Sequence, residues 1–216
     1  MFLYDRGVPR SDPALGLRER KNRRTQLAIV QAAAELTLEG GYASATIPRI
    51  AERADVSPRT VSTWFPAKDD ILFGPVDETI ARATEHLRAG PGDVVDRIAA
   101  WLTDESGREG HDPEISRLRD AAIAHYPALR ARAHQQFERV QSEIAAAVAR
   151  DTGAAAEDAG PQTFAGAAMA FLFTLRAIDL DGRGDAAAQT AVGIAFLTAG
   201  LASLRQPAPP YHKRGP

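Results

Sequence analysis

A chain of 216 residues, of which 44% are hydrophobic, is long enough to bury a sizeable core and suits one large domain or two small ones. It has no cysteine, which excludes a disulfide framework and a zinc site built from cysteines. The net charge of −2 is unevenly distributed along the chain. Residues 1–68 carry 11 Lys and Arg against 7 Asp and Glu, whereas residues 69–216 carry 15 Lys and Arg against 21 Asp and Glu, so the chain has a charge polarity. This polarity favours two domains, one basic and one acidic.

The first 24 residues combine a tail with the densest basic cluster of the chain. We expect an N-terminal tail over residues 1–18 and a first domain over residues 19–72. The start of the chain lacks the long apolar run of an export signal, so we expect a cytoplasmic protein. The basic cluster comprises Arg18, Arg20, Lys21, Arg23 and Arg24. It is either a solvated tail or a phosphate contact, because basic N-terminal arms often bind nucleic acid.

Residues 42–72 predict two short helices joined by a tight turn, which is a helix-turn-helix. The first helix begins at Thr46, whose hydroxyl we expect to cap an exposed backbone N–H. One apolar stripe at helical spacing follows: Ile47, Ile50, Ala51 and Ala54. The chain turns at Asp55, a residue type that tolerates left-handed dihedral angles, and Val56 is expected to pack between the helices.

The second helix has the stronger start signal. Ser57 is a favoured N-cap, and Pro58 suits the first helical position, where its missing N–H costs nothing. Val61 and Phe65, four residues apart, are expected to point inward. The opposite face then carries Pro58, Arg59, Ser62 and Thr63. This face can enter a major groove, where a guanidinium can donate two hydrogen bonds to guanine and hydroxyl groups can bond phosphates or base edges.

The order of these motifs resembles the tetracycline-repressor (TetR) family of bacterial transcription regulators. Residues 29–47 resemble the family's first helix, its glycine-tyrosine exit and the threonine that opens its second helix. The pattern continues through Ile50-Ala51-Glu52-Arg53-Ala54, Val56-Ser57, Trp64-Phe65-Pro66, Lys68 and Leu72. Asp55 replaces a usual glycine and Thr37 a common phenylalanine. The recognition helix also departs from the family pattern, at Arg59, Ser62, Thr63 and Trp64, so its base preference cannot be carried over.

The resemblance implies an all-α protein with a three-helix DNA-binding head, a helical ligand-binding and dimerisation body, and about nine helices. Thr46 and Lys68 are expected on phosphates. Together with the basic cluster and the recognition helix, the expected DNA-binding residues are Arg24, Thr46, Ser57, Pro58, Arg59, Thr60, Ser62, Thr63, Trp64 and Lys68.

The body is expected over residues 73–206, before a Pro-rich tail at 207–216. No strand-like alternation appears there, and caps punctuate one helix after another. Asp93, Asp112-Pro113, Pro127 and Gly160-Pro161 are the predicted starts, and a final helix is predicted to end near Arg205.

The last two predicted helices are apolar on more than one face. Residues 186–204 contain no charge, so this segment is either a membrane helix or, as we expect, a helix covered by protein. In the resembled family such a pair forms a four-helix dimer interface, whereas the alternative is that both helices fill the core of one protomer. Small residues, Gly166 with Ala170 and Gly193 with Gly200, could let helices approach closely. The predicted dimer contacts are Phe164, Ala170, Phe173, Val192, Phe196 and Ala199.

Large body residues could line a ligand cavity, although the same apolar types also fill cores. The predicted ligand contacts are Trp101, His125, Tyr126, Phe137, Val140 and Phe171. The run that begins at Tyr126 looks like the body of an actinobacterial subgroup linked to acyl-CoA-like ligands. His125 is either a ligand contact or an ordinary core or surface histidine.

These observations predict a homodimeric DNA-binding regulator, a repressor that a small hydrophobic ligand releases from a near-palindromic operator. The alternative is a DNA-binding regulator with a filled body and no effector. No nucleophile elbow, phosphate-binding glycine loop or pair of histidines at metal-ligand spacing indicates an enzyme, and no cofactor or metal is expected.

Overall fold

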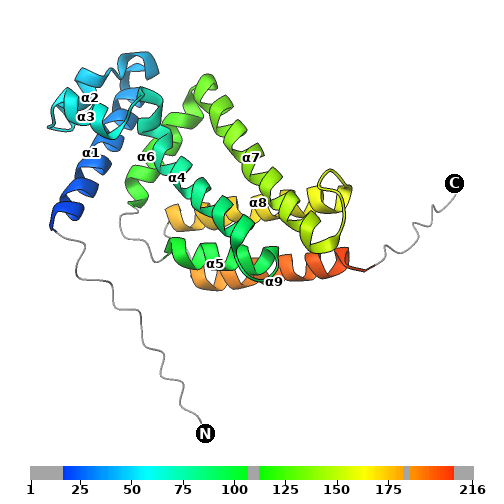
Figure 1. Cartoon of the computed structure of the whole chain (residues 1–216). Helices are drawn as coiled ribbons and strands as arrows, with labels where there is room; N and C mark the ends of the chain where they lie inside the picture. The colour runs from blue at the N-terminus through cyan, green and yellow to red at the C-terminus, as the bar shows by residue number, and fades with distance from the viewer. Residues whose placement is uncertain (1–16, 107–111, 182–184, 207–216) are drawn as a thin grey trace, which may run out of the picture.

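The computed structural model describes residues 17–106, 112–181 and 185–206, and within these ranges the chain forms nine α-helices and one short 3₁₀ helix, without strands (Figure 1). The elements are α1 (Leu17–Gly40), η1 (Tyr42–Ser44), α2 (Ile47–Arg53), α3 (Pro58–Trp64), α4 (Lys68–Ala89), α5 (Val94–Ser106), α6 (Pro113–His125), α7 (Pro127–Thr152), α8 (Ala159–Asp181) and α9 (Ala186–Leu204). The predicted all-α class is confirmed. Helix α1 takes in the last two residues of the predicted N-terminal tail, and the predicted C-terminal tail lies outside the described residues.

Local sequence sets the helix starts in the body. The carboxylate of Asp112 accepts hydrogen bonds from two backbone N–H groups of α6, whose first residue is a proline. Asp93 caps α5 in the same way. Pro127 begins α7 as predicted, and α8 begins at Ala159, one residue before the predicted glycine-proline pair.

The head is built around a core that α1, α2, α3 and the start of α4 share. Its largest fully buried members are Ile29, Leu36, Ile50, Val61, Ile71, Leu72 and Phe73. Residues of α6 and α7 complete the same cluster. The boundary predicted between residues 72 and 73 falls inside α4, which runs from the head into the body (Figure 1). Head and body are therefore packed together through one core and joined by a continuous helix.

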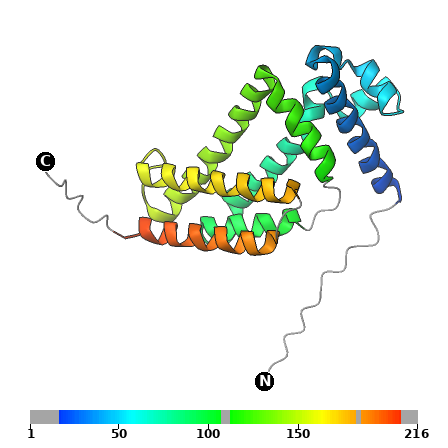
Figure 2. The ribbon, with the colours of Figure 1, turned by 180° about the vertical axis from the view of Figure 1, so that it is seen from behind.

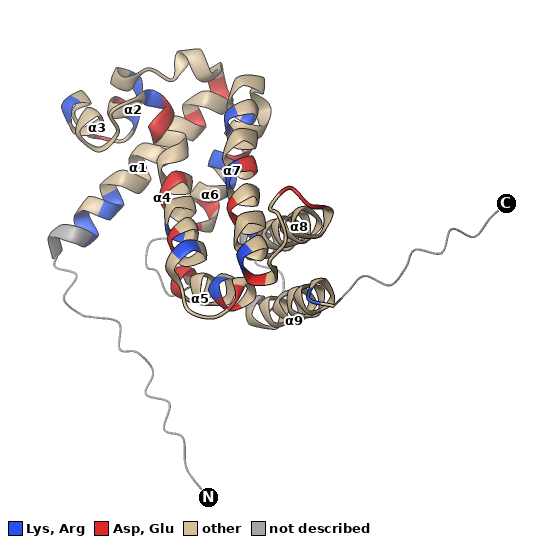
Figure 3. Cartoon of the chain, turned by 45° about the vertical axis from the view of Figure 1, so that its right-hand side comes forward, with Lys and Arg blue, Asp and Glu red and all other residues tan. Residues whose placement is uncertain are grey.

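The body has a second core, formed by the end of α4 with α5, α7, α8 and α9. Figures 1 and 2 show α8 and α9 side by side, on the part of the body away from α2 and α3. In Figure 3 these two helices carry few charged residues, in contrast to α4, α5 and α7. Large apolar side chains on them are exposed: Phe173 by 43%, Val192 by 67% and Phe196 by 64%.

One residue predicted at the dimer interface, Phe164, lies instead in the core of the protomer. Phe164 is only 5% exposed and belongs to the body core, because it faces Gly200 of α9 within the same chain. Gly193 likewise faces Phe171 of α8. The two glycines of α9 therefore serve packing inside the protomer, whereas a Cβ at Gly166 would meet no atom within 4 Å.

The segment Ala187–Leu204 is long and apolar enough to cross a membrane by length and composition alone, but length and composition are weak evidence. Only 11% of this segment is buried in the protomer. Most of this helix is therefore not covered by its own chain, although the sequence predicted a helix covered by protein.

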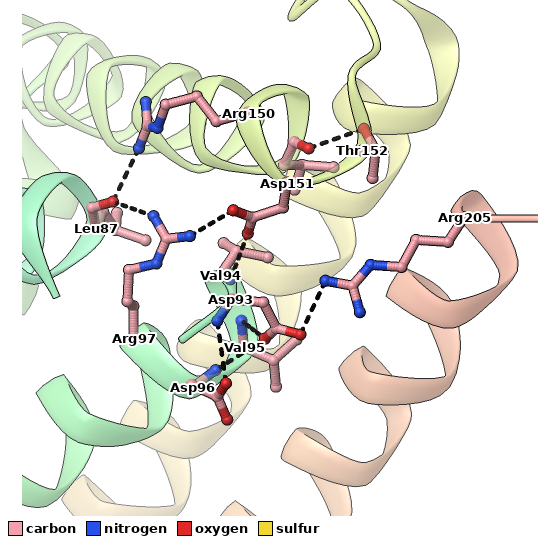
Figure 4. A network of polar contacts seen from close by, with 11 residues as sticks. Leu87, Asp93, Val94, Val95, Asp96, Arg97, Arg150, Asp151, Thr152 and Arg205 are labelled. Atoms are coloured by element: carbon pink, nitrogen blue, oxygen red, sulfur yellow. Dashed lines mark hydrogen bonds and ion pairs between the residues drawn. The ribbon is translucent and has the colours of Figure 1, made fainter. Parts of the chain in front are cut away.

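The far end of α4 is held by a buried polar network (Figure 4). The main-chain oxygen of Leu87 accepts hydrogen bonds from Arg97 over 2.8 Å and from Arg150 over 2.9 Å. Arg97 also pairs with Asp151 of α7 at 2.5 Å, and these side chains are only 7% and 13% exposed. At the surface beside this network, Arg205 pairs with Asp93 at 3.1 Å. The network fixes the last turn of α4 against α5 and α7.

Candidate nucleic-acid interface

The turn between α2 and α3 has the predicted chemistry. Asp55 adopts a left-handed φ of 53°, and the Oγ of Ser57 accepts a hydrogen bond from the backbone N–H of Thr60 over 3.0 Å. Pro58 occupies the first helical position. Val56 is half-buried against the head core, which agrees with its predicted place between the helices. This turn sets the direction in which α3 leaves the head.

The cap predicted at Thr46 is wrong in its chemistry. Thr46 stands at the N-cap position of α2 with an extended backbone, but its side chain makes no capping hydrogen bond. A cap normally accepts from the second or third N–H of the helix, and Pro48 removes one of these donors. The exposed hydroxyl of Thr46 therefore remains available for another partner.

Helix α3 has one buried and one exposed face, as predicted. Val61 and Phe65 are 0% and 7% exposed, whereas Pro58, Arg59, Ser62 and Thr63 are exposed. The side chains of Arg59 and Ser62 form no hydrogen bond or ion pair with the described residues, while Thr63 donates to the main-chain oxygen of Arg59 over 2.8 Å. The exposed face thus presents an unpaired guanidinium and a free hydroxyl.

Two further residues of this predicted set are partly engaged. The hydroxyl of Thr60 bonds that of Ser57 over 2.8 Å. Trp64 is half-buried and packs against the head core, because it lies next to the inward-facing Phe65.

Lys68 is held against Tyr42 at the start of α4. Its Nζ donates to the main-chain oxygen of Tyr42 over 2.7 Å and lies 3.7 Å from the centroid of the Tyr42 ring. Partial burial lowers the pKa of Lys68 below its ordinary value. The hydroxyl of Tyr42 donates to Asp69. Tyr42 is not among the DNA-binding residues predicted from the sequence, although it belongs to the glycine-tyrosine pair at the exit of the first helix.

The basic cluster lies on a helix rather than in a tail. Arg20, Lys21 and Arg24 are exposed on the first turns of α1, where Figure 3 shows basic residues along the helix. These three basic side chains are therefore held on an α-helix of the head.

Arg53 joins α2 to α1 at the surface of the head. Its guanidinium pairs with Glu39 at 2.9 Å and with Glu35 at 3.1 Å, both on α1. The hydrogen bond from Arg53 lowers the pKa of the Glu39 carboxyl, and the same bond raises the pKa of Arg53. These exposed pairs orient α2 more than they stabilise the fold.

Comparisons with known proteins agree with this geometry. Residues 29–73 match the family described as "Bacterial regulatory proteins, tetR family", and residues 94–206 match the "MftR C-terminal domain". The chain belongs to the TetR family. The regulator TcmR of Streptomyces glaucescens is 28% identical over 151 residues, which are 66% of this chain and 67% of TcmR. YdeS of Bacillus subtilis (strain 168), an uncharacterised HTH-type regulator, is 38% identical over 63 residues, which are 29% of this chain and 30% of YdeS.

Solved structures show the same fold. A putative TetR-family transcriptional regulator from Rhodococcus sp. superposes with a TM-score of 0.53 at 23% identity, covering 84% of this chain and 99% of that chain. E. coli NemR in its reduced form has a TM-score of 0.53 at 16% identity, covering 81% and 96%. TetR-family members are DNA-binding transcription factors, so the prediction that this chain is not an enzyme is confirmed.

The predicted ligand contacts divide between two places in this TetR-family body. His125 is exposed beside Tyr126, with ring centroids 5.0 Å apart, and Tyr126 packs against the head core. Val140, which is 8% exposed, belongs to the body core, and the half-buried Phe137 and Phe171 pack against this core. The structure therefore does not bring the whole predicted set together.

The remaining predicted ligand contact, Trp101, is half-buried on α5. Its Nε1 is enclosed and has no hydrogen-bond partner among the described residues. Phe137 meets Phe173 of α8 edge to face, with centroids 4.7 Å apart. One aromatic pair thus lies where α7 and α8 meet.

Proposed function

We propose that this TetR-family regulator is a cytoplasmic homodimeric repressor that binds a near-palindromic operator through two copies of α3. The observation that carries the proposal is the exposed face of α3, on which Arg59 and Ser62 have no partner among the described residues. A guanidinium left free in this way can read guanine in a major groove. Thr46 and Lys68, with Arg24 on α1, flank this face as phosphate contacts.

The dimer is supported by the apolar surface of α8 and α9. Their exposed Phe173, Val192 and Phe196 would be costly to leave in water, and a second copy of the same surface would cover them. Ala170 and Ala199 are exposed on the same helices. Two-fold symmetry of the protein would then match two-fold symmetry of the operator.

The effector is proposed as a small hydrophobic or acyl-CoA-like molecule that enters the body and releases DNA. The enclosed, unpaired Nε1 of Trp101 supports a ligand that can accept a hydrogen bond there. Release requires that ligand and DNA favour different conformations of the dimer. The second candidate is a regulator without an effector. Two observations favour it: Val140 is buried in the body core, and Tyr126 packs against the head core whereas Phe137 and Phe171 pack against the body core.

Fluorescence anisotropy with the DNA that flanks the gene tests the operator proposal. Binding to this DNA and to an unrelated duplex should be compared at two salt concentrations. We expect tight, selective and salt-sensitive binding, because phosphate contacts release counterions. Equal, weak affinity for both duplexes, together with the absence of any enriched sequence in a genome-wide selection of bound DNA, would contradict an operator-binding function.

Thermal unfolding with a panel of hydrophobic acids, acyl-CoAs and planar drugs tests the effector proposal. A ligand at 100 times its Kd stabilises the folded state by about 2.7 kcal/mol and raises the melting temperature accordingly. A panel without any shift would favour the regulator without an effector.

A further inference from the structure

An arginine of the body lies at the centre of the contacts between α7 and the first turns of α4. Arg132 of α7 is half-buried, with its Nη1 3.3 Å from Asp69 and its Nη2 3.5 Å from both Asp70 and Asp77. Its guanidinium carbon lies 4.5 Å from the centroid of the buried Phe73 ring. One cation from the body thus faces three carboxylates and one aromatic ring of α4.

The contact with Asp69 continues to the DNA-facing side of the head. Asp69 accepts the hydroxyl of Tyr42, and the main chain and ring of Tyr42 hold the Nζ of Lys68. Four side chains therefore connect α7 to Lys68 in the order Arg132, Asp69, Tyr42 and Lys68. We refer to these four residues as the Arg132 relay.

The charge of Asp69 explains why a cation is needed at this place. Asp69 follows Lys68 directly in the sequence, so its carboxylate lies close to the position proposed for a DNA phosphate. An unpaired carboxylate there would repel DNA and would compete for the ammonium group of Lys68. Arg132 offsets part of this charge, since it pairs with Asp69 as well as with Asp70 and Asp77, while Asp69 accepts the hydroxyl of Tyr42. The ammonium group of Lys68 then remains directed by Tyr42 alone.

We propose that Arg132 and Asp69 are positioning residues for DNA binding, so that a movement of α7 changes the affinity for DNA through the Arg132 relay. The proposal rests on the proposed phosphate contact of Lys68. Helix α7 also carries Phe137, which packs edge to face on Phe173 of α8. A rearrangement of the body helices can therefore reach the DNA-binding surface through side-chain contacts, in addition to the covalent path along α4.

The first test is the affinity of the full chain for its operator after Arg132→Met. We expect binding weaker by roughly five- to tenfold, which is the range of an ordinary coupling between sites. Arg88→Met is the matched control. Arg88 lies on the exposed surface of α4 and pairs with Glu143 of α7, with a hydrogen bond of 2.9 Å from its Nε, so the control removes one positive charge and one contact between the same two helices. The control should change affinity by less than about twofold.

A double-mutant cycle with Asp69→Asn separates the relay from a general loss of packing. Asparagine keeps an oxygen that can accept the hydroxyl of Tyr42 but carries no charge that pairs with Arg132. Asp69→Asn alone should bind within about twofold of the original protein, and Arg132→Met should then cause no more than about a twofold further loss. Arg132→Lys should recover part of the affinity because it keeps the charge. A full loss from Arg132→Met in both backgrounds would overturn the relay.

Lys68→Ala distinguishes failure of the relay from failure of the proposed phosphate contact. If Lys68→Ala weakens DNA binding but Arg132→Met behaves as Arg88→Met does, the relay is wrong and the phosphate contact stands. If Lys68→Ala leaves affinity unchanged, both are wrong. Circular dichroism and the melting temperature show whether each variant is folded. If Arg132→Met does not fold, the variants Asp69→Asn and Arg132→Lys still test the relay.

Discussion

The hydroxyl of Tyr126 donates a hydrogen bond of 2.9 Å to the main-chain oxygen of Thr37, which joins the junction of α6 and α7 to the last turns of α1. The same oxygen accepts the N–H of Gly41 over 2.9 Å. Gly41 has a φ of 90°, and a Cβ there would lie 3.4 Å from the Tyr126 hydroxyl. The end of α1 is therefore shaped by a body residue 89 positions away in the chain.

Replacing Tyr126 by phenylalanine removes this hydroxyl and leaves the ring in place. We expect Tyr126→Phe to lower the free energy of unfolding by about 1 kcal/mol, since the oxygen of Thr37 keeps its bond with Gly41. Urea unfolding followed by circular dichroism measures the change. An unfolding free energy equal to that of the original chain would mean that the bond adds nothing to the attachment of the head.

The parts of the site that sequence reasoning predicted depend on neighbouring residues. Ser57 with Pro58 marks the start of α3, Asp55 permits the left-handed turn, and the spacing of Val61 and Phe65 shows which face is buried. Each of these signals acts within one or two helical turns. The local sequence therefore sufficed to identify the exposed face of α3.

The parts that sequence reasoning missed depend on residues far apart in the chain. Tyr126 meets Thr37, and Arg132 meets Asp69, only after the body has folded onto the head. Phe164 and Phe173 both lie on α8, a helix with apolar residues on several sides, so periodicity could not tell which of them faces the core of the protomer. Thr46 has the position and extended backbone of a cap, but its hydroxyl makes no capping bond, and Pro48 removes only one of the two donors within its reach.

The buried pair of Arg97 and Asp151 gives a test of the network at the end of α4 (Figure 4). Asp151→Asn leaves a buried guanidinium without its counter-ion, and the loss of one member of such a pair costs about 3 to 5 kcal/mol. We expect a loss of that size in chemical unfolding, with unchanged contacts at the distant α3.

Asp93→Asn is the matched control for this prediction. It removes the carboxylate that pairs with the more exposed Arg205 at 3.1 Å and keeps an N-cap residue of similar strength for α5. An exposed pair contributes less than about 1 kcal/mol. Equal losses for Asp151→Asn and Asp93→Asn would contradict a special role for the buried pair.

Arg59 and Lys68 are predicted to contribute to DNA binding in different ways. Arg59→Ala should reduce discrimination between the operator and a mutated operator by about 1 to 3 kcal/mol, because a bidentate contact to a base is lost. Lys68→Ala should weaken binding to all DNA similarly and reduce the salt slope by about one. Anisotropy titrations at several salt concentrations measure both effects. The same pattern of loss in both variants would refute the assignment of one residue to bases and the other to phosphates.

Phe196 tests the proposed dimer because it is 64% exposed on α9 and packs on little of its own chain. Phe196→Asp should leave the protomer folded but produce monomers, since an unpaired carboxylate would be buried in the interface with the second copy. Size-exclusion chromatography with light scattering measures the mass, and affinity for a two-site operator should fall with it. Leu38→Asp, the same kind of change at an apolar residue that is 38% exposed on the head, should leave the mass of the dimer unchanged. A Phe196→Asp variant that remains dimeric would show that the dimer does not form through α9.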